Sequence, residues 1–271
     1  MLEQFIGIEQ VDVAEAKALY KEAFNDSDAF TDLYFNAYSK NNKYFFWKMN
    51  HQIVCMACVN KKRIFVNGQK KTAGFIVAVA TKKEYRNQGL MKSIFQKWLD
   101  DISMEFSEIF IQAYNWNVYK SYDFLICTLK KEYTLKKDQF LKPSLFYQKI
   151  DYDQILKIQK EFICKNQIKN YSYKTKKENK LYYKMFMAAN DKIYMNKFVY
   201  LVVSNNDTVV DFAYTDLKEF IKLISNFKEQ ELKIKSYLDL DKRFFVQINK
   251  DIVDTKIYKK KNFDIFFNEA F

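Results

Sequence analysis

Glycine and proline are scarce in this sequence, which has 4 Gly and 1 Pro among 271 residues. Because glycine is so rare, a glycine that follows a strand-like segment marks a place where the backbone needs unusual freedom. Two common phosphate-binding loops are missing, since neither G-x-x-x-x-G-K-[ST] nor G-x-G-x-x-G occurs. Nucleotide kinases and Rossmann dehydrogenases therefore have little support.

Histidine and paired cysteines are scarce as well. His51 is the only histidine and lies in a predicted turn, which disfavours Ser–His–Asp catalysis. Cys55 and Cys58 form one C-x-x-C motif, but it lies in the apolar segment "QIVCMACV" and no second C-x-x-C follows. We therefore expect buried structural thiols, no metal site and a reducing, cytoplasmic location.

Long apolar runs are missing too. No stretch approaches the ~20 residues that a membrane-spanning helix needs, and "MLEQFIGIEQ" does not resemble a signal peptide. The net charge is +12, which would allow attraction to nucleic acid. The lysines are scattered along the chain, so a solvated surface is favoured over a nucleic-acid partner, and no membrane partner is expected.

The composition of 49% hydrophobic and 29% charged residues is typical of a folded chain. The periodicity predicts an α/β protein (an α+β mixed sheet) with two halves, 1–143 and 144–271, that meet at Pro143. The segments predicted to be helical are Val13–Phe24, Ala29–Tyr38, Gly89–Phe106, Asp153–Ile168, Leu181–Asn190 and Leu217–Phe227. The main predicted strands are Tyr44–Lys48, Gln52–Val59, Arg63–Val66, Thr72–Ala80 and Ile109–Tyr114, a strand pair is expected around Leu125–Tyr133, and "NG" at 67–68 predicts a hairpin.

One stretch carries most of the functional information. "GFIVAVATKKEYRNQGLMKSIF" runs from an apolar strand through a glycine turn into an amphipathic helix. The first N–H groups of a helix have no intrahelical partners, and the helix dipole adds positive potential there. Gly89 lets a ligand approach the backbone, and Arg86 and Lys92 add charge-assisted contacts. The pattern predicts a cradle for an anion such as a pyrophosphate.

The same stretch resembles the acetyl-CoA-binding segment of GNAT-superfamily N-acetyltransferases, R-x-x-G-x-[GA]. Arg86 and Gly89 match, whereas Met91 replaces the last small residue, as in a subset that resembles the enhanced intracellular survival (Eis) acetyltransferases. "NVYKSYDF" is similar to the late GNAT element, with Tyr119 and Phe124 in place and Asp123 where glycine is usual. The resemblance covers about 1–135. It implies two tandem GNAT-like lobes, the second degenerate, without the third, sterol-carrier-like domain.

This resemblance implies an N-acetyltransferase that transfers acetyl from acetyl-CoA to a primary amine. Backbone groups around Val77, Ala78 and Val79 would contact the pantetheine arm and the acetyl oxygen, and Tyr119 would protonate the departing thiolate. The residues predicted to hold the pyrophosphate are Arg86, Asn87, Gln88, Gly89, Leu90, Met91 and Lys92.

The acceptor and the general base stay open. The acceptor is a small-molecule or peptide amine, and the carboxylate of Phe271 is one candidate for the base. The alternative function is a non-catalytic protein that senses acyl-CoA or binds RNA.

Overall fold

The computed structural model describes residues 2–37, 42–147, 149–260 and 265. The chain divides into two compact units that are not consecutive in sequence. Unit 1 contains 1–64, 70–127 and 255–263, and unit 2 contains the remainder. The boundary predicted at Pro143 does not coincide with this division, because 128–143 belong to unit 2 and 255–263 to unit 1.

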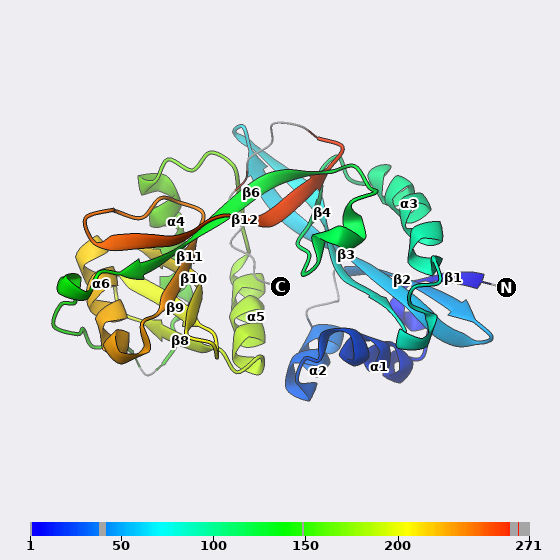
Figure 1. The fold of residues 1–271 in the computed structure, drawn as a ribbon, viewed down its shortest axis with the longest axis horizontal. Coiled ribbons are helices and arrows are strands. Elements are labelled where there is room, and N and C mark those ends of the chain that lie inside the picture. Colours follow the sequence, from blue (N-terminus) through cyan, green and yellow to red (C-terminus); the bar gives the residue numbers. More distant parts are fainter. Residues whose placement is uncertain (1, 38–41, 148, 261–264, 266–271) are drawn as a thin grey trace. The chain divides into compact units, whose positions relative to one another are not determined.

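Unit 1 consists of a mixed sheet with helices on both faces (Figure 1). Its strands follow the order β1-β2-β3-β4-β5-β12-β6. The bounds are β1 Leu2–Ile6, β2 Asn42–Met49, β3 Gln52–Val66, β4 Gln69–Thr81, β5 Ile109–Ile111, β6 Phe124–Leu135 and β12 Phe245–Tyr258, with helices α1 Val13–Phe24, α2 Asp28–Asn36 and α3 Leu90–Ser103. The mixed α/β fold predicted from the sequence is confirmed.

Alternation along β2 separates the two helical layers. Phe45 and Trp47 belong to the core that α3 covers with Phe95, Trp98 and Leu99. The neighbouring residues point the other way, since Tyr44 stacks on Phe35 of α2 at a ring distance of 5.8 Å. Successive side chains of a strand point to opposite faces. An aromatic-rich strand therefore fills both cores of unit 1.

The same alternation explains the two cysteines of the C-x-x-C motif. Cys55 and Cys58 are both buried in β3, three residues apart, so they face opposite sides of the sheet. Cys55 belongs to the α3-side core, whereas Cys58 lies beside Tyr34 of α2 and Asn42. Both thiols are free, and burial raises the pKa of each. Two thiols on opposite faces cannot bind one ion or form a disulfide with each other.

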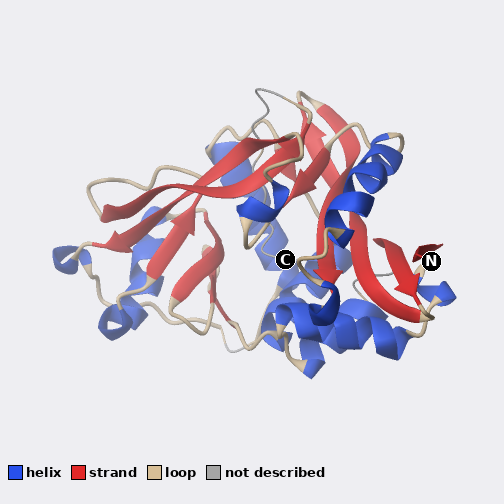
Figure 2. Cartoon of the chain, turned by 45° about the vertical axis from the view of Figure 1, so that its right-hand side comes forward, coloured by secondary structure: helices blue, strands red, loops and turns tan. Residues whose placement is uncertain are grey.

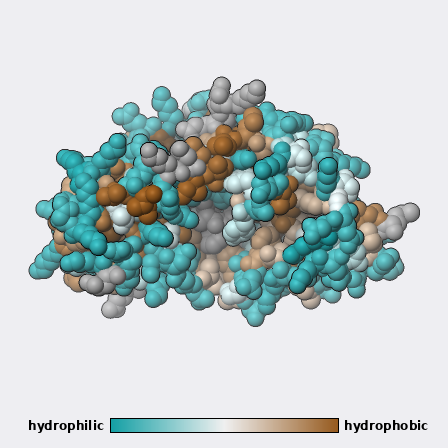
Figure 3. Space-filling view, in the orientation of Figure 1, coloured by the Kyte–Doolittle hydropathy of each residue, from teal (hydrophilic) through white to brown (hydrophobic). Residues whose placement is uncertain are grey.

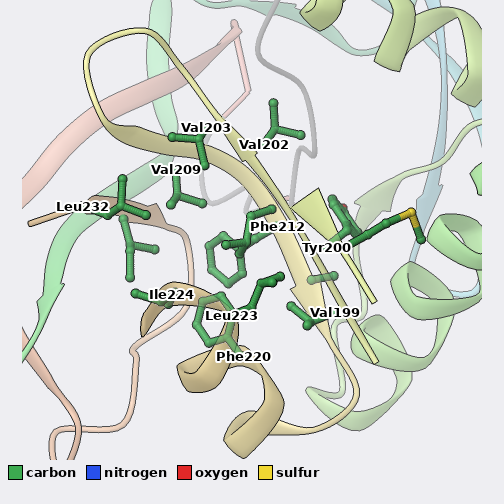
Figure 4. Close-up of a cluster of buried hydrophobic side chains, with 14 of the residues drawn as sticks. Val199, Tyr200, Val202, Val203, Val209, Phe212, Phe220, Leu223, Ile224 and Leu232 are labelled. Carbon is green, nitrogen blue, oxygen red and sulfur yellow. The ribbon is translucent and has the colours of Figure 1, made fainter. Parts of the chain in front are cut away.

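Unit 2 is a second arrangement of strands and helices (Figure 2). Its strand order is β6-β11-β10-β9-β8, in which β10 and β11 are parallel and the other neighbouring pairs are antiparallel. The bounds are β7 Tyr171–Ser172, β8 Lys192–Met195, β9 Val199–Val203, β10 Thr208–Tyr214 and β11 Lys233–Ser236, with helices α4 Tyr152–Lys165, α5 Lys176–Ala188 and α6 Leu217–Ile224. The β9–β10 hairpin and α6 build the centre of its core (Figure 4).

β6 and β12 lie next to each other and contribute residues to both units. Four of their apolar side chains stay exposed, Ile126 and Leu129 on β6 and Val246 and Ile248 on β12. Figure 3 shows hydrophobic residues gathered over these two strands on a face that is otherwise largely hydrophilic. No helix in the described ranges is long and apolar enough to cross a membrane.

Candidate functional site

The candidate site begins where two parallel strands of unit 1 part. β4 pairs with β5 over Gly74–Ile76, opposite Ile109–Ile111. β5 ends at Ile111, whereas β4 continues to Thr81. On its β5 side, the segment Val77–Val79 therefore lies beyond the end of the neighbouring strand. Its three residues are only half-buried, although the four residues directly before them, 73–76, are buried. This opening presents backbone donors and acceptors to a ligand.

A residue in the left-handed conformation lies in the middle of the opening. Ala78 has a φ of 53°, a left-handed conformation that residues with a Cβ seldom adopt. Within a strand, such a residue interrupts the regular ladder and changes the direction of the backbone groups around it. Non-glycine residues in unusual conformations often occur at functional sites. The sequence prediction named Val77–Val79, but an alanine gives no sequence signal for the left-handed conformation.

A compact turn connects β4 to α3. The short 3-10 helix Lys83–Tyr85 follows the strand, and Asn87 has a φ of 61°. Two side chains fasten the turn to its own backbone: Arg86 Nε donates to the Thr81 carbonyl at 2.8 Å, and Gln88 Nε2 donates to the Glu84 carbonyl at 2.7 Å. Asn87 and Gln88, both predicted as cofactor contacts, therefore also shape the turn.

Gly89 is the residue before the first turn of α3. Its φ is 75°, and no side chain caps the helix. The first helical bond runs from the Ser93 N–H to the Gly89 carbonyl at 3.0 Å, so the N–H groups of residues 90–92 precede the helical ladder. A Cβ built on Gly89 would meet nothing within 4 Å. The glycine is required by its backbone angle, and the space in front of it is open.

The charges around this helix start are positive. Arg86 and Lys92 are both exposed at either end of the turn. The guanidinium of Arg86 has an acidic neighbour, because its Nη2 lies 3.5 Å from Oε1 of Glu22 on α1. The first turn of α3 itself contains no acidic residue. Cationic side chains and N–H groups that precede the helical ladder are features that favour the binding of an anion.

Leu90 and Met91 lie on the opposite side of this turn. Both are half-buried and pack against the core beneath α3, together with Ile94. Met91 replaces the small residue of the R-x-x-G-x-[GA] pattern, and the structure shows where its side chain goes. It contributes to the hydrophobic core, and it leaves the open space in front of Gly89 unobstructed.

Tyr119 ends the 3-10 helix Trp116–Tyr119, which follows β5. Its ring packs against Phe95 of α3 at 5.5 Å and against Phe124 at 6.2 Å. Burial, with a smaller contribution from Tyr122, raises the pKa of its phenol. The phenol is therefore a neutral hydrogen donor over the physiological pH range. Helix α3 thus contributes both to the anion cradle and to the packing of this tyrosine.

Asp123 does not force an unusual turn. The residues with positive φ in the described chain include Ala78 and Asn87 but not Asp123. Its carbonyl accepts the Lys259 N–H at 2.8 Å. Since its φ is negative, no glycine is needed here, and the departure from the "xxYxxxGF" element is accommodated without strain.

Sequence reasoning missed an acidic group in unit 1. Asp26 follows α1 and accepts a hydrogen bond of 2.9 Å from the Tyr20 hydroxyl. Burial raises the pKa of Asp26, and the bond from Tyr20 partly opposes that effect. Tyr114, three residues beyond β5, is near enough to contribute to the raised pKa of Tyr20, after burial and Asp26. A half-buried carboxylate therefore lies near the segment that follows β5, and no spacing motif marks it in the sequence.

Two residues that the sequence analysis weighed for catalysis remain, His51, which it disfavoured, and Phe271. His51 lies in the β2–β3 turn, where Asn50 and His51 have φ values of 50° and 64°. His51 is therefore one of the two central residues of the hairpin turn and has the positive φ typical of that position. Phe271, the candidate base, lies outside the described residues.

Comparison with known proteins identifies the first part of the chain. Residues 5–127 match the family model of the acetyltransferase (GNAT) domain. The resemblance seen in the sequence is thereby confirmed for these residues. No curated protein matches the sequence.

Solved structures of similar fold extend over nearly the whole chain. A conserved Enterococcus faecalis protein, titled a probable N-acyltransferase, aligns with a TM-score of 0.71 at 13% identity, over 95% of this chain and 72% of its own. A GCN5-related N-acetyltransferase from Anabaena variabilis gives 0.67 at 11% identity, over 95% and 72%. Eis1 from Mycobacterium abscessus gives 0.64 at 10% identity, over 95% and 73%. At these identities the likeness establishes the fold.

Proposed function

We propose that this chain, in which residues 5–127 are a GNAT acetyltransferase domain, transfers acetyl from acetyl-CoA to a primary amine. The observation that carries the proposal is the geometry of β4 and α3 in unit 1. The strand extends beyond its parallel neighbour, and the helix after it begins at an uncapped glycine between two cationic residues. The space in front of Gly89 is open and would admit a pyrophosphate.

Each part of the site has one role. Backbone groups of Val77–Val79 would hold the pantetheine arm and polarise the thioester carbonyl. Arg86, Lys92 and the first N–H groups of α3 would hold the pyrophosphate. When bound, acetyl-CoA supplies the thioester carbon that the amine attacks.

Proton transfer completes the reaction. A neutral amine nitrogen forms the new C–N bond, the C–S bond breaks, and Tyr119 gives its phenolic proton to the leaving sulfur. The raised pKa of Tyr119, caused first by burial, keeps that proton in place until the sulfur becomes basic. Tyr119 then regains a proton from solvent, and the proton that the amine loses is released.

Asp26 extends the proposal to the acceptor. Its carboxylate is close enough to Tyr114 to raise the pKa of that phenol, after burial, and Tyr114 follows β5, the strand whose end creates the opening. A partly desolvated carboxylate attracts a cationic amine more strongly than a fully hydrated one. We therefore assign Asp26 to amine binding. The proposed acceptor is the amine of a small molecule or of a peptide.

Ligand binding measured in parallel tests the function against its alternatives. The melting temperature should rise with acetyl-CoA and with coenzyme A, because a ligand that prefers the folded state stabilises it. Release of free thiol from acetyl-CoA in the presence of polyamine, aminoglycoside and peptide amines should then reveal turnover. Binding without turnover for any amine would favour an acyl-CoA sensor. A shift with RNA alone would favour the RNA-binding alternative.

A further inference from the structure

A glutamate on α1 holds the turn that precedes α3. Oε1 of Glu22 accepts the backbone N–H of Lys83, and the same oxygen lies 3.5 Å from Nη2 of Arg86. Resting on the function proposed above, we infer that Glu22 is a positioning residue of the cofactor site with two opposing effects. It holds the turn in place through Lys83, and it competes with the pyrophosphate for Arg86.

The two contacts of Glu22 depend on different properties. The bond from the Lys83 N–H requires only an acceptor oxygen, which a carboxylate and an amide both provide. The contact with Arg86 is an ion pair, so it requires the negative charge. A variant that keeps the acceptor but removes the charge therefore separates the two effects.

The position of Arg86 makes the competition specific. Its Nε donates to the Thr81 carbonyl at 2.8 Å, which fixes one edge of the guanidinium on the end of β4. The outer nitrogens remain for an anion, and Glu22 is the carboxylate beside one of them. A pyrophosphate bound by Arg86 at the start of α3 would therefore lie close to the negative charge of Glu22. That charge weakens the hold of Arg86 on the cofactor.

Helix α1 supplies a matched control. Glu15 lies seven residues before Glu22, two helical turns away and on the same side of the helix. Its Oε1 accepts the backbone N–H of Ile53 at 2.7 Å, so it fastens α1 to β3 as Glu22 fastens α1 to the turn. Glu15 has the same chemistry as Glu22 but a different target. It should affect the docking of α1 without affecting Arg86.

The test is the affinity for coenzyme A in the full chain, measured by calorimetry. Glu22→Gln should bind coenzyme A about twofold to fivefold more tightly than the wild type, which is the range of an exposed ion pair. The gain should shrink at high salt, since both side chains are partly exposed, Arg86 by 42% and Glu22 by 35%. Glu15→Gln should bind as the wild type does.

Two further measurements isolate the mechanism. S-acetylpantetheine is an acetyl donor that lacks the pyrophosphate. Glu22→Gln should therefore leave the kcat/KM for S-acetylpantetheine unchanged, while it lowers the KM for acetyl-CoA. Glu22→Ala removes the acceptor for Lys83 as well, so it should bind coenzyme A less tightly than Glu22→Gln. A general change in folding would instead change the kinetic constants for both acetyl donors in the same way.

The outcomes distinguish this inference from the proposed function. If the wild type binds coenzyme A and Glu22→Gln binds it equally or more weakly, the competition is refuted while the function stands. Equal affinities of the Gln and Ala variants would refute the positioning role. If the wild type does not bind coenzyme A, the proposed function fails and this inference fails with it.

Discussion

The helices α3 and α6 both follow a strand, but they begin in opposite ways. At α3 the residue before the helix is Gly89, with a φ of 75° and no side-chain cap. At α6 it is Asp216, whose carboxylate accepts the N–H groups of Lys218 at 2.8 Å and Glu219 at 3.1 Å. The start of α3 leaves its donors for an external anion, whereas the start of α6 satisfies them within the chain.

This difference shows that the residue before the helix decides whether the first N–H groups of a strand-to-helix step are satisfied within the chain. Asp216 supplies the negative charge that a helix N-terminus attracts, and it occupies the same N–H groups that a phosphate would use. Glu219 adds a second negative charge in the first turn of α6. The same N–H groups can thus either be capped by a side chain, which stabilises the helix, or bind an external anion.

The largest effect is expected when the start of α3 is made to resemble that of α6. Gly89→Asp should weaken coenzyme A binding by about 100-fold or more, because the new carboxylate would accept the free N–H groups and repel the pyrophosphate. Calorimetry on both proteins measures the change. Gly89→Asn is the control, since asparagine has a similar size and tolerates the left-handed conformation but carries no charge. Equal losses in the two variants would assign the effect to the backbone rather than to the charge.

Chemistry should be separable from this binding difference. Tyr119→Phe should lower kcat by about 100-fold, the size of a general-acid contribution, while the Kd for coenzyme A changes little. The phenylalanine keeps the packing against Phe95 and Phe124. Single-turnover kinetics and calorimetry measure the two quantities. Unchanged turnover with a competent amine would show that Tyr119 serves only the core.

Local patterns predicted most of the elements. The helix Val13–Phe24 has the bounds that the periodicity gave, because an apolar stripe and the cap of Asp12 define it. The hairpin at Asn67–Gly68 is confirmed, with φ values of 49° and 80°. The predicted Gly89–Phe106 helix is confirmed as α3, Leu90–Ser103. These elements are determined by residues that are close together in the sequence, so one sequence is enough to predict them.

The differences arise where tertiary contacts override local sequence. β3 is one strand rather than two, because Lys62 is buried within it and places its ammonium 5.7 Å from the centre of the Phe75 ring. β6 is likewise one strand in place of the predicted pair. Helix α5 starts at Lys176, five residues before the prediction, because a capping box of Thr175 and Glu178 lies inside a lysine-rich stretch.

The candidate site was predictable only in part. Glycine scarcity and the R-x-x-G spacing indicated the turn at Gly89. The left-handed conformation of Ala78, the Tyr20–Asp26 bond and the Glu22–Arg86 pair depend on segments brought together by the fold. Short motifs carry no information about such pairings.

The buried acids extend the contrast between the units. Asp26 in unit 1 is half-buried, whereas Asp211 in unit 2 is buried and accepts bonds from the hydroxyls of Tyr183 at 2.8 Å and Tyr200 at 3.1 Å. Burial raises the pKa of Asp211 from 3.8 to about 6. A raised pKa means that the folded state favours the protonated acid. Its stabilising contribution is therefore present below pH 4 and is lost as the pH rises through 6.

Asp211→Asn should remove this dependence. Between pH 4 and 7 the free energy of unfolding of the variant should rise by about 2 kcal/mol relative to that of the wild type. Urea unfolding of both proteins at several pH values measures the difference, and effects of other groups cancel in it. Coenzyme A affinity should not change, because Asp211 lies in unit 2. A constant difference across the pH range would contradict the raised pKa.

The smallest effect is expected at α6 itself. Asp216→Ala removes a cap and should lower the free energy of unfolding by about 1 kcal/mol. It should not create a second coenzyme A site, since Glu219 remains in the first turn of α6. The segment before α6 also has no arginine that would correspond to Arg86 before α3. Calorimetry should give one ligand per chain for both the wild type and the variant. A second ligand in the wild type would show that Asp216 does not prevent binding. A second ligand in Asp216→Ala alone would show that its carboxylate is the only barrier, and that the cationic residues around Gly89 contribute less than we assign to them.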